Sequence, residues 1–126
     1  MYRNGLFLIA KRPVGKHLAG YWEFPGGKIQ DGESSPECLR RELAEELGIH
    51  VSVGPLFLEH THEYADRTVH LLTYLVSAHE DPEPKEHEAL AWVTAQELLE
   101  CQLSPADIAV AKKLLNTPKT ALENQS

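Results

Sequence analysis

Apolar residues recur along the chain with two different spacings. Short apolar or alternating runs, with the period of two that is typical of half-buried strands, predict strands over 6–10, 21–24, 51–63, 69–78 and 89–93. Between the second and third of these runs, leucines recur every fourth residue, which is typical of an amphipathic helix. Because strands and helices follow one another in this order, the pattern predicts an α+β fold.

The first predicted helix follows a loop that contains proline and glycine. Ser35 can cap this helix, Pro36 fits its first position, and Gly48 is a favourable terminator. The buried face is predicted from three leucines at helical spacing: Leu39, Leu43 and Leu47. The sequence therefore predicts a helix over 35–47.

Two further helices are predicted near the C-terminus. Thr94 and Glu97 have the spacing of a capping box that opens a short helix. Ser104 and the proline after it open a last helix that extends to about residue 115. The polar segment 116–126 is expected to be a flexible tail, and the whole chain, 1–126, is expected to form a single domain.

Composition narrows the classes of protein. The net charge of −7 argues against duplex nucleic acid as a partner. No apolar run is long enough to span a membrane, and the first residues do not look like a signal peptide. Cys38 and Cys101 are too few for a disulfide framework. These features predict a cytoplasmic protein without a membrane partner, and they leave its oligomeric state open.

Three glutamates share one face of the helix over 35–47. Glu42, Glu45 and Glu46 are related by spacings of three and four residues, so neighbouring side chains lie about 5–6 Å apart. Clustered carboxylates repel one another unless a cation lies among them, and oxygen ligands suit Mg²⁺ or Mn²⁺. Arg41 can reach Glu45 on the next turn, and Glu33 if the loop folds back. A solvated helix with salt bridges is the alternative interpretation of such a pattern.

The spacing of residues over the whole segment 27–49 favours a metal site over a solvated helix with salt bridges. Residues 27–49 read Gly-x5-Glu-x7-Arg-Glu-Leu-x-Glu-Glu-x-Gly-Ile, which matches the Nudix box at each defined position. The chain thus resembles the Nudix hydrolases, in particular the MutT-like nucleotide pyrophosphohydrolases. Segments 21–29, 85–88 and 104–108 also look like MutT-type segments. The resemblance implies the Nudix fold, an α/β/α sandwich with a mixed β-sheet.

The start of the chain departs from this family pattern. Asn4-Gly5 is typical of a hairpin turn, yet almost no residues precede it. MutT-like proteins carry an apolar strand before that turn. The first strand is therefore expected to be missing from the sheet, which would leave an exposed edge.

The resemblance also implies roles for particular residues. Glu42, Glu45 and Glu46 look like the glutamates of the box that bind Mg²⁺ and act in catalysis, and Glu86 matches a loop glutamate that completes the cluster or acts as the base. The carbonyl of Gly26 is implied as a further metal ligand. Two other box residues, Glu33 and Arg41, are expected to brace the loop on the helix.

The implied reaction is hydrolysis of a nucleoside triphosphate to the monophosphate and pyrophosphate. Asp107 occupies the position where MutT-like proteins place an Asn or Asp that contacts the base; first-turn dipole stabilisation of a helix is its alternative role. The other candidate substrate-binding residues are Arg12, Phe24 and Arg67. His60 and His62 alternate on a strand and are interpreted as a polar face rather than a zinc site.

The leading substrate expected from the sequence is an oxidised nucleotide such as 8-oxo-dGTP. The alternative in the same class is CTP or 5-methyl-dCTP, since the stretch from His87 to Asp107 looks at least as much like that branch. A non-catalytic nucleotide-binding sensor module and a hydrolase of ADP-ribose or dinucleoside polyphosphates are the remaining alternatives.

Overall fold

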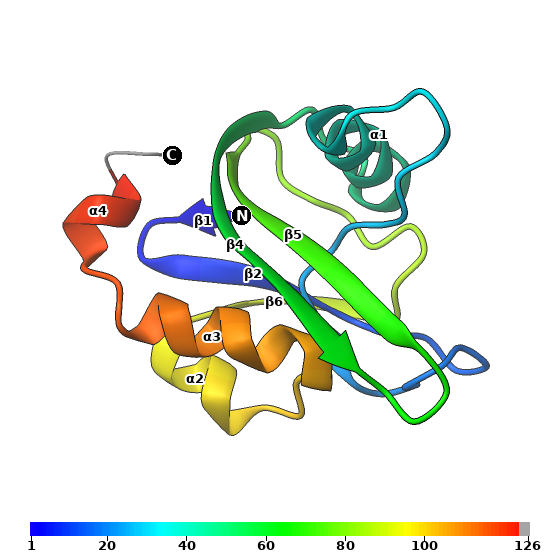
Figure 1. Ribbon diagram of the computed structural model, residues 1–126. Helices are drawn as coiled ribbons and strands as arrows, with labels where there is room; N and C mark the ends of the chain where they lie inside the picture. The colour runs from blue at the N-terminus through cyan, green and yellow to red at the C-terminus, as the bar shows by residue number, and fades with distance from the viewer. Residues whose placement is uncertain (124–126) are drawn as a thin grey trace.

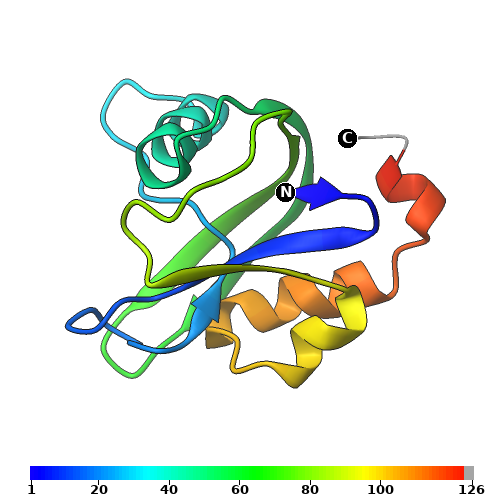
Figure 2. The ribbon, with the colours of Figure 1, turned by 180° about the vertical axis from the view of Figure 1, so that it is seen from behind.

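The central sheet is built around one strand, β2 (Leu6–Lys11). In the computed structural model, which describes residues 1–123, β1 (Tyr2–Arg3) and β3 (Trp22–Glu23) pair with opposite ends of β2. β6 (Ala89–Val93) pairs with β2 from Phe7 to Lys11. All these pairs are antiparallel, and Trp22 also forms a parallel bridge with Leu103, so the sheet is mixed as the fold class predicted. Figure 2 shows β6 running alongside β2.

The first strand is shortened rather than missing. Tyr2 pairs with Phe7, and Arg3 pairs with Leu6. The turn between them has positive φ at both central residues, 52° at Asn4 and 83° at Gly5, which suits a tight hairpin with the twist of the flanking strands. The prediction of a missing strand was wrong because two residues are enough here for one antiparallel pairing, and the buried Tyr2 ring packs against Phe7.

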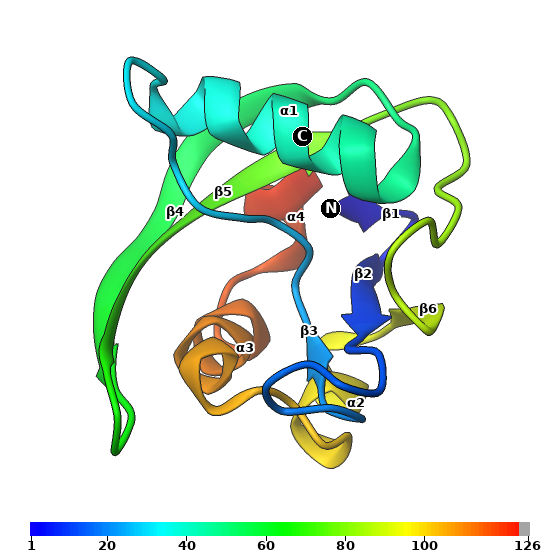
Figure 3. The same ribbon diagram turned by 90° about the vertical axis from the view of Figure 1, so that its right-hand side faces the viewer.

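A long hairpin forms the second sheet. β4 (Ser52–Glu63) and β5 (Thr68–Ser77) pair from Ser52–Ser77 to Glu63–Thr68, within one residue of the predicted bounds. The amide of Tyr64 donates to the carbonyl of Arg67 at 2.7 Å and closes the turn. Figure 3 shows this hairpin curving along one side of the molecule, from α1 past α3.

Helix α1 (Ser35–Leu47) begins at a different cap from the one predicted. Ser34, not Ser35, is the N-cap, because Glu37 lies three residues after Ser34 and completes a capping box with it. The hydroxyl of Ser35 instead forms a hydrogen bond of 2.7 Å with that of Tyr74 on β5. Gly48 ends the helix in the left-handed conformation, as predicted.

The C-terminal part contains more helix than the sequence indicated. α2 (Ala95–Glu100) has the predicted capping box. The predicted last helix divides into a 3-10 turn, η1 (Pro105–Asp107), and α3 (Ile108–Leu115). The flexible tail was a wrong prediction for 119–123, which form α4 (Lys119–Glu123): Leu122 is only 4% exposed and packs into the core. The rest of the predicted tail, 124–126, lies outside the described residues.

The central sheet separates two groups of helices and two parts of the core. On β2, Phe7 and Ile9 pack with residues of α2, α3 and α4, while Leu8 faces Leu43 and Leu47 of α1. This division follows from the alternation of side chains along a strand. Figure 1 shows α1 on one side of the sheet and α2 and α3 on the other. Within residues 1–123, every helix is too short or too polar to span a bilayer.

Candidate active site

Arg41 joins the glycine-rich loop to the box helix. Its guanidinium forms two hydrogen bonds with Glu33, at 2.7 and 3.0 Å, and donates to the carbonyl of Lys28 at 3.2 Å. It also contacts Glu42 at 2.8 Å and Glu45 at 3.3 Å. Hydrogen bonds from Arg41 lower the pKa of Glu33 to about 2. The loop is thus held on α1 by a paired charge, in the arrangement expected from the sequence.

Glu46 is buried among other carboxylates without a compensating charge. The residue is 7% exposed, and its Oε2 has no hydrogen-bond partner among the described residues. Burial, followed by the charges of Glu42, Glu23 and Glu86, raises its pKa to about 8, although a backbone hydrogen bond with Gly26 acts in the opposite direction. Glu86 itself is exposed. The site therefore gathers four carboxylates from three segments of the chain.

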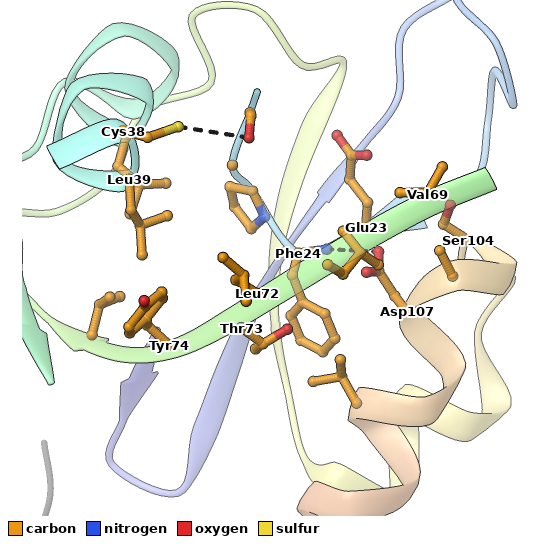
Figure 4. Close-up of a pocket in the computed structure, with 18 of the residues that line it drawn as sticks. Glu23, Phe24, Cys38, Leu39, Val69, Leu72, Thr73, Tyr74, Ser104 and Asp107 are labelled. Atoms are coloured by element: carbon orange, nitrogen blue, oxygen red, sulfur yellow. Dashed lines mark hydrogen bonds between the residues drawn. The ribbon is translucent and has the colours of Figure 1, made fainter. Parts of the chain in front are cut away.

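Gly27 allows the loop to pass directly over this cluster. A Cβ at this position would lie 2.1 Å from Cδ of Glu42, so any side chain would displace that carboxylate. Cys38 on α1 lies 3.7 Å from the carbonyl of Gly27, as the dashed line in Figure 4 shows. The glycine at the first position of the motif thus has a steric basis in this chain.

Glu23 is a site residue that the sequence reasoning missed. It accepts a hydrogen bond from Arg12 at 2.7 Å and forms another with the buried His87 at 2.8 Å. Burial opposes ionisation, but the bonds from His87 and Arg12 outweigh it and lower the pKa of Glu23. His87 comes from the loop that carries Glu86, and its side chain bonds to Glu23. The one signal in the sequence was a carboxylate between two aromatic residues of a short strand.

The loop that carries Glu86 is attached to two elements. The amide of Lys85 donates to the carbonyl of Glu46 at 3.0 Å, next to the C-terminus of α1. The amide of Glu88 donates to the carbonyl of Lys11 at 2.9 Å, at the end of β2. These bonds hold Glu86 near the glutamates of the helix even though nearly 40 residues separate it from them in the sequence.

A cavity of about 740 Å³ opens between the central sheet, the long hairpin and α1. Its walls include all four residues predicted to bind substrate: Arg12, Phe24, Arg67 and Asp107. Glu23, Gly26 and Gly27 also line it, so the cavity reaches the edge of the carboxylate cluster. Figure 4 shows Phe24 between β5 and the start of η1, with Asp107 beside it. This volume suits a ligand of nucleotide size.

Asp107 is held against the backbone of β3. Its Oδ2 accepts a hydrogen bond from the amide of Phe24 at 3.3 Å. Burial raises the pKa of Asp107 to about 7, with the bond from Phe24 acting in the opposite direction. The residue occupies the N-cap of α3, yet its side chain forms no capping hydrogen bond there. Its carboxylate is therefore directed to the cavity wall rather than to the helix end.

The described residues fit a hard divalent cation in their chemistry. Glu46 offers a buried oxygen without a partner, Gly27 leaves the space for Glu42, and each candidate side chain supplies oxygen. Within residues 1–123, no three His, Cys, Asp or Glu side chains already lie in a geometry that could hold an ion. Arg41 bonds to one carboxylate oxygen of Glu42 and one of Glu45, which leaves the second oxygen of each side chain for a cation.

Comparisons with known proteins agree with this arrangement. Residues 1–115 match the family model described as the NUDIX domain. The CTP pyrophosphohydrolase of Escherichia coli K12 is 40% identical over 114 residues, covering 90% of this chain and 84% of that protein. The 8-oxo-dGTP diphosphatase of the same strain is 36% identical over 112 residues, covering 88% and 87%.

A solved structure shows the same fold. The solution structure of the E. coli ORF135 protein superposes with a TM-score of 0.78 at 41% identity, covering 87% of this chain and 79% of that one. The family match spans the box helix, the Glu86 loop and the segment that contains Asp107. From the complete box, the cluster that it forms and these similarities, we conclude that the chain belongs to the Nudix hydrolase family.

Proposed function

We propose that this chain hydrolyses nucleoside triphosphates to nucleoside monophosphates and pyrophosphate, with Mg²⁺ or Mn²⁺ as its cofactor. The observation that carries the proposal is the buried, unpartnered oxygen of Glu46, in a carboxylate cluster whose member Glu23 lines a nucleotide-sized cavity. Burying a carboxylate among other carboxylates is unfavourable unless a cation neutralises them. Such a cluster beside a cavity is expected where phosphates and a metal ion bind together.

The glutamates of α1 would hold the cation. Glu46 is the central ligand in this proposal, with Glu42, Glu45, Glu86 and the carbonyl of Gly26 around it. A bound divalent ion supplies positive charge that stabilises the phosphate oxygens and lowers the pKa of a water molecule.

The remaining side chains position the substrate and accept a proton. Either Glu42 or Glu86 acts as the base that takes the proton from the attacking water. The bond between the bridging oxygen and the β-phosphorus then breaks, and the nucleoside monophosphate leaves with the bridging oxygen. Arg41 holds Glu42 at 2.8 Å and so limits the positions that this carboxylate can adopt. Arg12 and Arg67 line the cavity and are proposed to face the phosphates.

The base is proposed to lie between Phe24 and Asp107. A carboxylate accepts a hydrogen bond from the exocyclic amine of cytosine or guanine. Cytosine nucleotides are the first candidates, because the similarity to the CTP pyrophosphohydrolase covers 90% of the chain at 40% identity. Nucleotides such as 8-oxo-dGTP, expected first from the sequence, are the second, supported by the 36% identity to an 8-oxo-dGTP diphosphatase.

A pyrophosphate-release assay tests this proposal. CTP, 5-methyl-dCTP, dGTP and 8-oxo-dGTP are compared with and without Mg²⁺, and ADP-ribose is followed by its own products. Magnesium-dependent release of pyrophosphate, fastest from the cytosine nucleotides, is expected. Binding of these nucleotides without any product would contradict the proposal and favour a sensor module. Cleavage of ADP-ribose alone would favour a different hydrolase.

A further inference from the structure

One face of β4 points toward the segment that carries Asp107. His60, His62 and Tyr64 are each partly buried, whereas Thr61 and Glu63 between them are exposed. This alternation places the side chains of His60 and His62 on the inner face of β4, and Tyr64, the first residue after the strand, lies on the same side. The sequence had indicated only a polar strand face here, and its partner is η1.

The peptide groups on both sides of Ala106 are held by this face. The carbonyl of Ala106 accepts a hydrogen bond of 2.7 Å from Nε2 of His60. The amide of Ala106 donates to the hydroxyl of Tyr64 at 3.1 Å. Ala106 is 7% exposed, so its peptide groups are largely shielded from water. Because a carbonyl only accepts, His60 must carry its proton on Nε2 in this arrangement.

Tyr64 also connects other segments around the cavity. Its ring packs edge-on against His62 at 4.6 Å and against His17 at 5.8 Å between ring centroids. The guanidinium of Arg67 lies 6.0 Å from the ring centroid. These contacts restrict the orientation of the ring, so its hydroxyl is fixed opposite the amide of Ala106.

We propose that His60 and Tyr64 are positioning residues that fix Asp107 in the cavity and thereby set the preference between bases. Asp107 directly follows the alanine whose two polar atoms they hold. If either bond is lost, a buried peptide group is left without a partner, and η1 must shift to satisfy it. The bond of 3.3 Å between Asp107 and Phe24 shifts with it, and the carboxylate leaves its place beside the base.

This proposal rests on the proposed function, since it concerns how that site selects the base of its nucleotide substrate. A zinc site on His60 and His62 is the alternative role for this face. It is disfavoured because Nε2 of His60 already bonds to the carbonyl of Ala106. The inner face of β4 is therefore assigned a role in positioning the protein backbone.

Four variants of the full chain test the proposal. Tyr64→Phe removes only the hydroxyl, and His60→Leu removes the donor. His60→Gln retains a donor and is the rescue variant. Tyr21→Phe is the matched tyrosine control, because Tyr21 does not line the cavity.

Two quantities are measured in each variant. The first is the ratio of kcat/KM for CTP to that for 8-oxo-dGTP, and the second is the hydrogen-exchange rate of the Ala106 amide. In Tyr64→Phe the ratio is expected to change about threefold to tenfold, which corresponds to one hydrogen bond. The change should lie in KM more than in kcat, and the Ala106 amide should exchange faster. His60→Leu should also change the ratio, His60→Gln should largely restore it, and Tyr21→Phe should leave both quantities unchanged.

The outcomes separate this proposal from the one it rests on. Faster exchange of the Ala106 amide with an unchanged base ratio would overturn the positioning role and leave a purely structural one. An unchanged exchange rate in Tyr64→Phe would overturn the hydrogen-bonded arrangement itself. If the wild-type chain releases no pyrophosphate, the proposed function fails. The ratio is then taken from dissociation constants of the α,β-imido analogues of CTP and 8-oxo-dGTP, and the same two results decide the positioning role.

Discussion

The two ends of the cavity differ in how their buried polar groups are satisfied. Around Glu46, four carboxylates gather and one buried oxygen has no partner among residues 1–123. Around Asp107, the protein supplies partners: the amide of Phe24 bonds to its carboxylate, and His60 and Tyr64 bond to the neighbouring peptide groups. At the first end a buried carboxylate oxygen has no partner within residues 1–123, and we propose that a cation fills this role. At the second end the protein itself bonds to the Asp107 carboxylate and to the peptide groups beside it, and the unpartnered atom there is Nδ1 of the His60 ring.

This difference indicates that the two ends of the cavity have different roles. An uncompensated cluster is costly in the free protein and becomes favourable when a cation and phosphates arrive. A preorganised pocket instead discriminates between ligands, because its polar groups cannot move to suit the wrong base. Variants at the carboxylate end are expected to change turnover, and variants at the base end are expected to change substrate preference.

The largest effect is expected from Glu46→Gln. The amide keeps the shape of the side chain but removes the charge that would face the cation. We expect kcat to fall more than about 100-fold, since changes to groups that only support metal ligands already cost about 10–100-fold. Steady-state kinetics with Mg²⁺ measures this, and thermal unfolding of the metal-free variant shows that it is folded. Turnover within a factor of about three of the wild type would remove Glu46 from the metal site.

Arg41→Lys is expected to have the next largest effect. Lysine cannot replace the two bonds to Glu33 together with those to Glu42 and Lys28. The expected loss is about 10–100-fold in kcat. Its matched control is Arg40→Lys on the adjacent, exposed position of α1, which should be nearly neutral. An equal loss in both variants would show that the effect comes from the helix surface in general.

Asp107→Asn tests the end of the cavity where the base is proposed to bind. The amide donates as well as accepts, so the ratio of kcat/KM between CTP and 8-oxo-dGTP should change by about tenfold or more. The kcat for the better substrate should change far less, since the carboxylate cluster is untouched. Asp66→Asn, in the exposed turn of the hairpin, is the control. A uniform loss of kcat for both bases would contradict a role in base preference.

The smallest effect concerns stability in the absence of metal. The folded-state pKa of Glu46 is about 8 and that of Asp107 about 7, above the ordinary values of 4.5 and 3.8. Between these limits the folded chain binds more protons than the unfolded chain, so its free energy of unfolding falls as pH rises from about 5 to 8. The melting temperature in EDTA should therefore decrease over this range.

Two substitutions test which residues cause the decrease in melting temperature. Glu46→Gln and Asp107→Asn should each flatten the dependence on pH, with the larger change from Glu46. Glu100→Gln, which alters an exposed carboxylate of α2, should leave the slope as it is. A melting temperature that rises from pH 5 to 8 would contradict the account of both buried carboxylates.

Part of the carboxylate end could be predicted from the sequence because two of its members are local. Glu42 and Glu46 lie one turn apart on α1, so helical spacing alone brings them together, whereas Glu23 and Glu86 come from other segments of the chain. The predicted N-cap of α1, Ser35, was one residue too late, since the adjacent Ser34 can also act as a cap. The glutamate three residues after Ser34 was the signal that distinguishes them.

The base end could not be predicted in the same way. It joins β3, β4 and η1, whose bonded residues lie about 40 to 80 positions apart, and no spacing rule encodes such contacts. Glu23, a member of the carboxylate cluster, was missed for the same reason, because its partners Arg12 and His87 come from two other segments. Helix α4 was missed because its sequence is mostly polar, and only one leucine, Leu122, packs into the core.

Cation binding to the metal-free protein tests the central claim most directly. Titration with Mn²⁺, followed by the loss of the free-ion signal in electron paramagnetic resonance, gives the number of sites and the affinity of wild type and Glu46→Gln. We expect saturable binding to the wild type, accompanied at pH 7 by release of a proton from Glu46, and at least about tenfold weaker binding to the variant. Equal binding to both proteins, or none to the wild type, would contradict it.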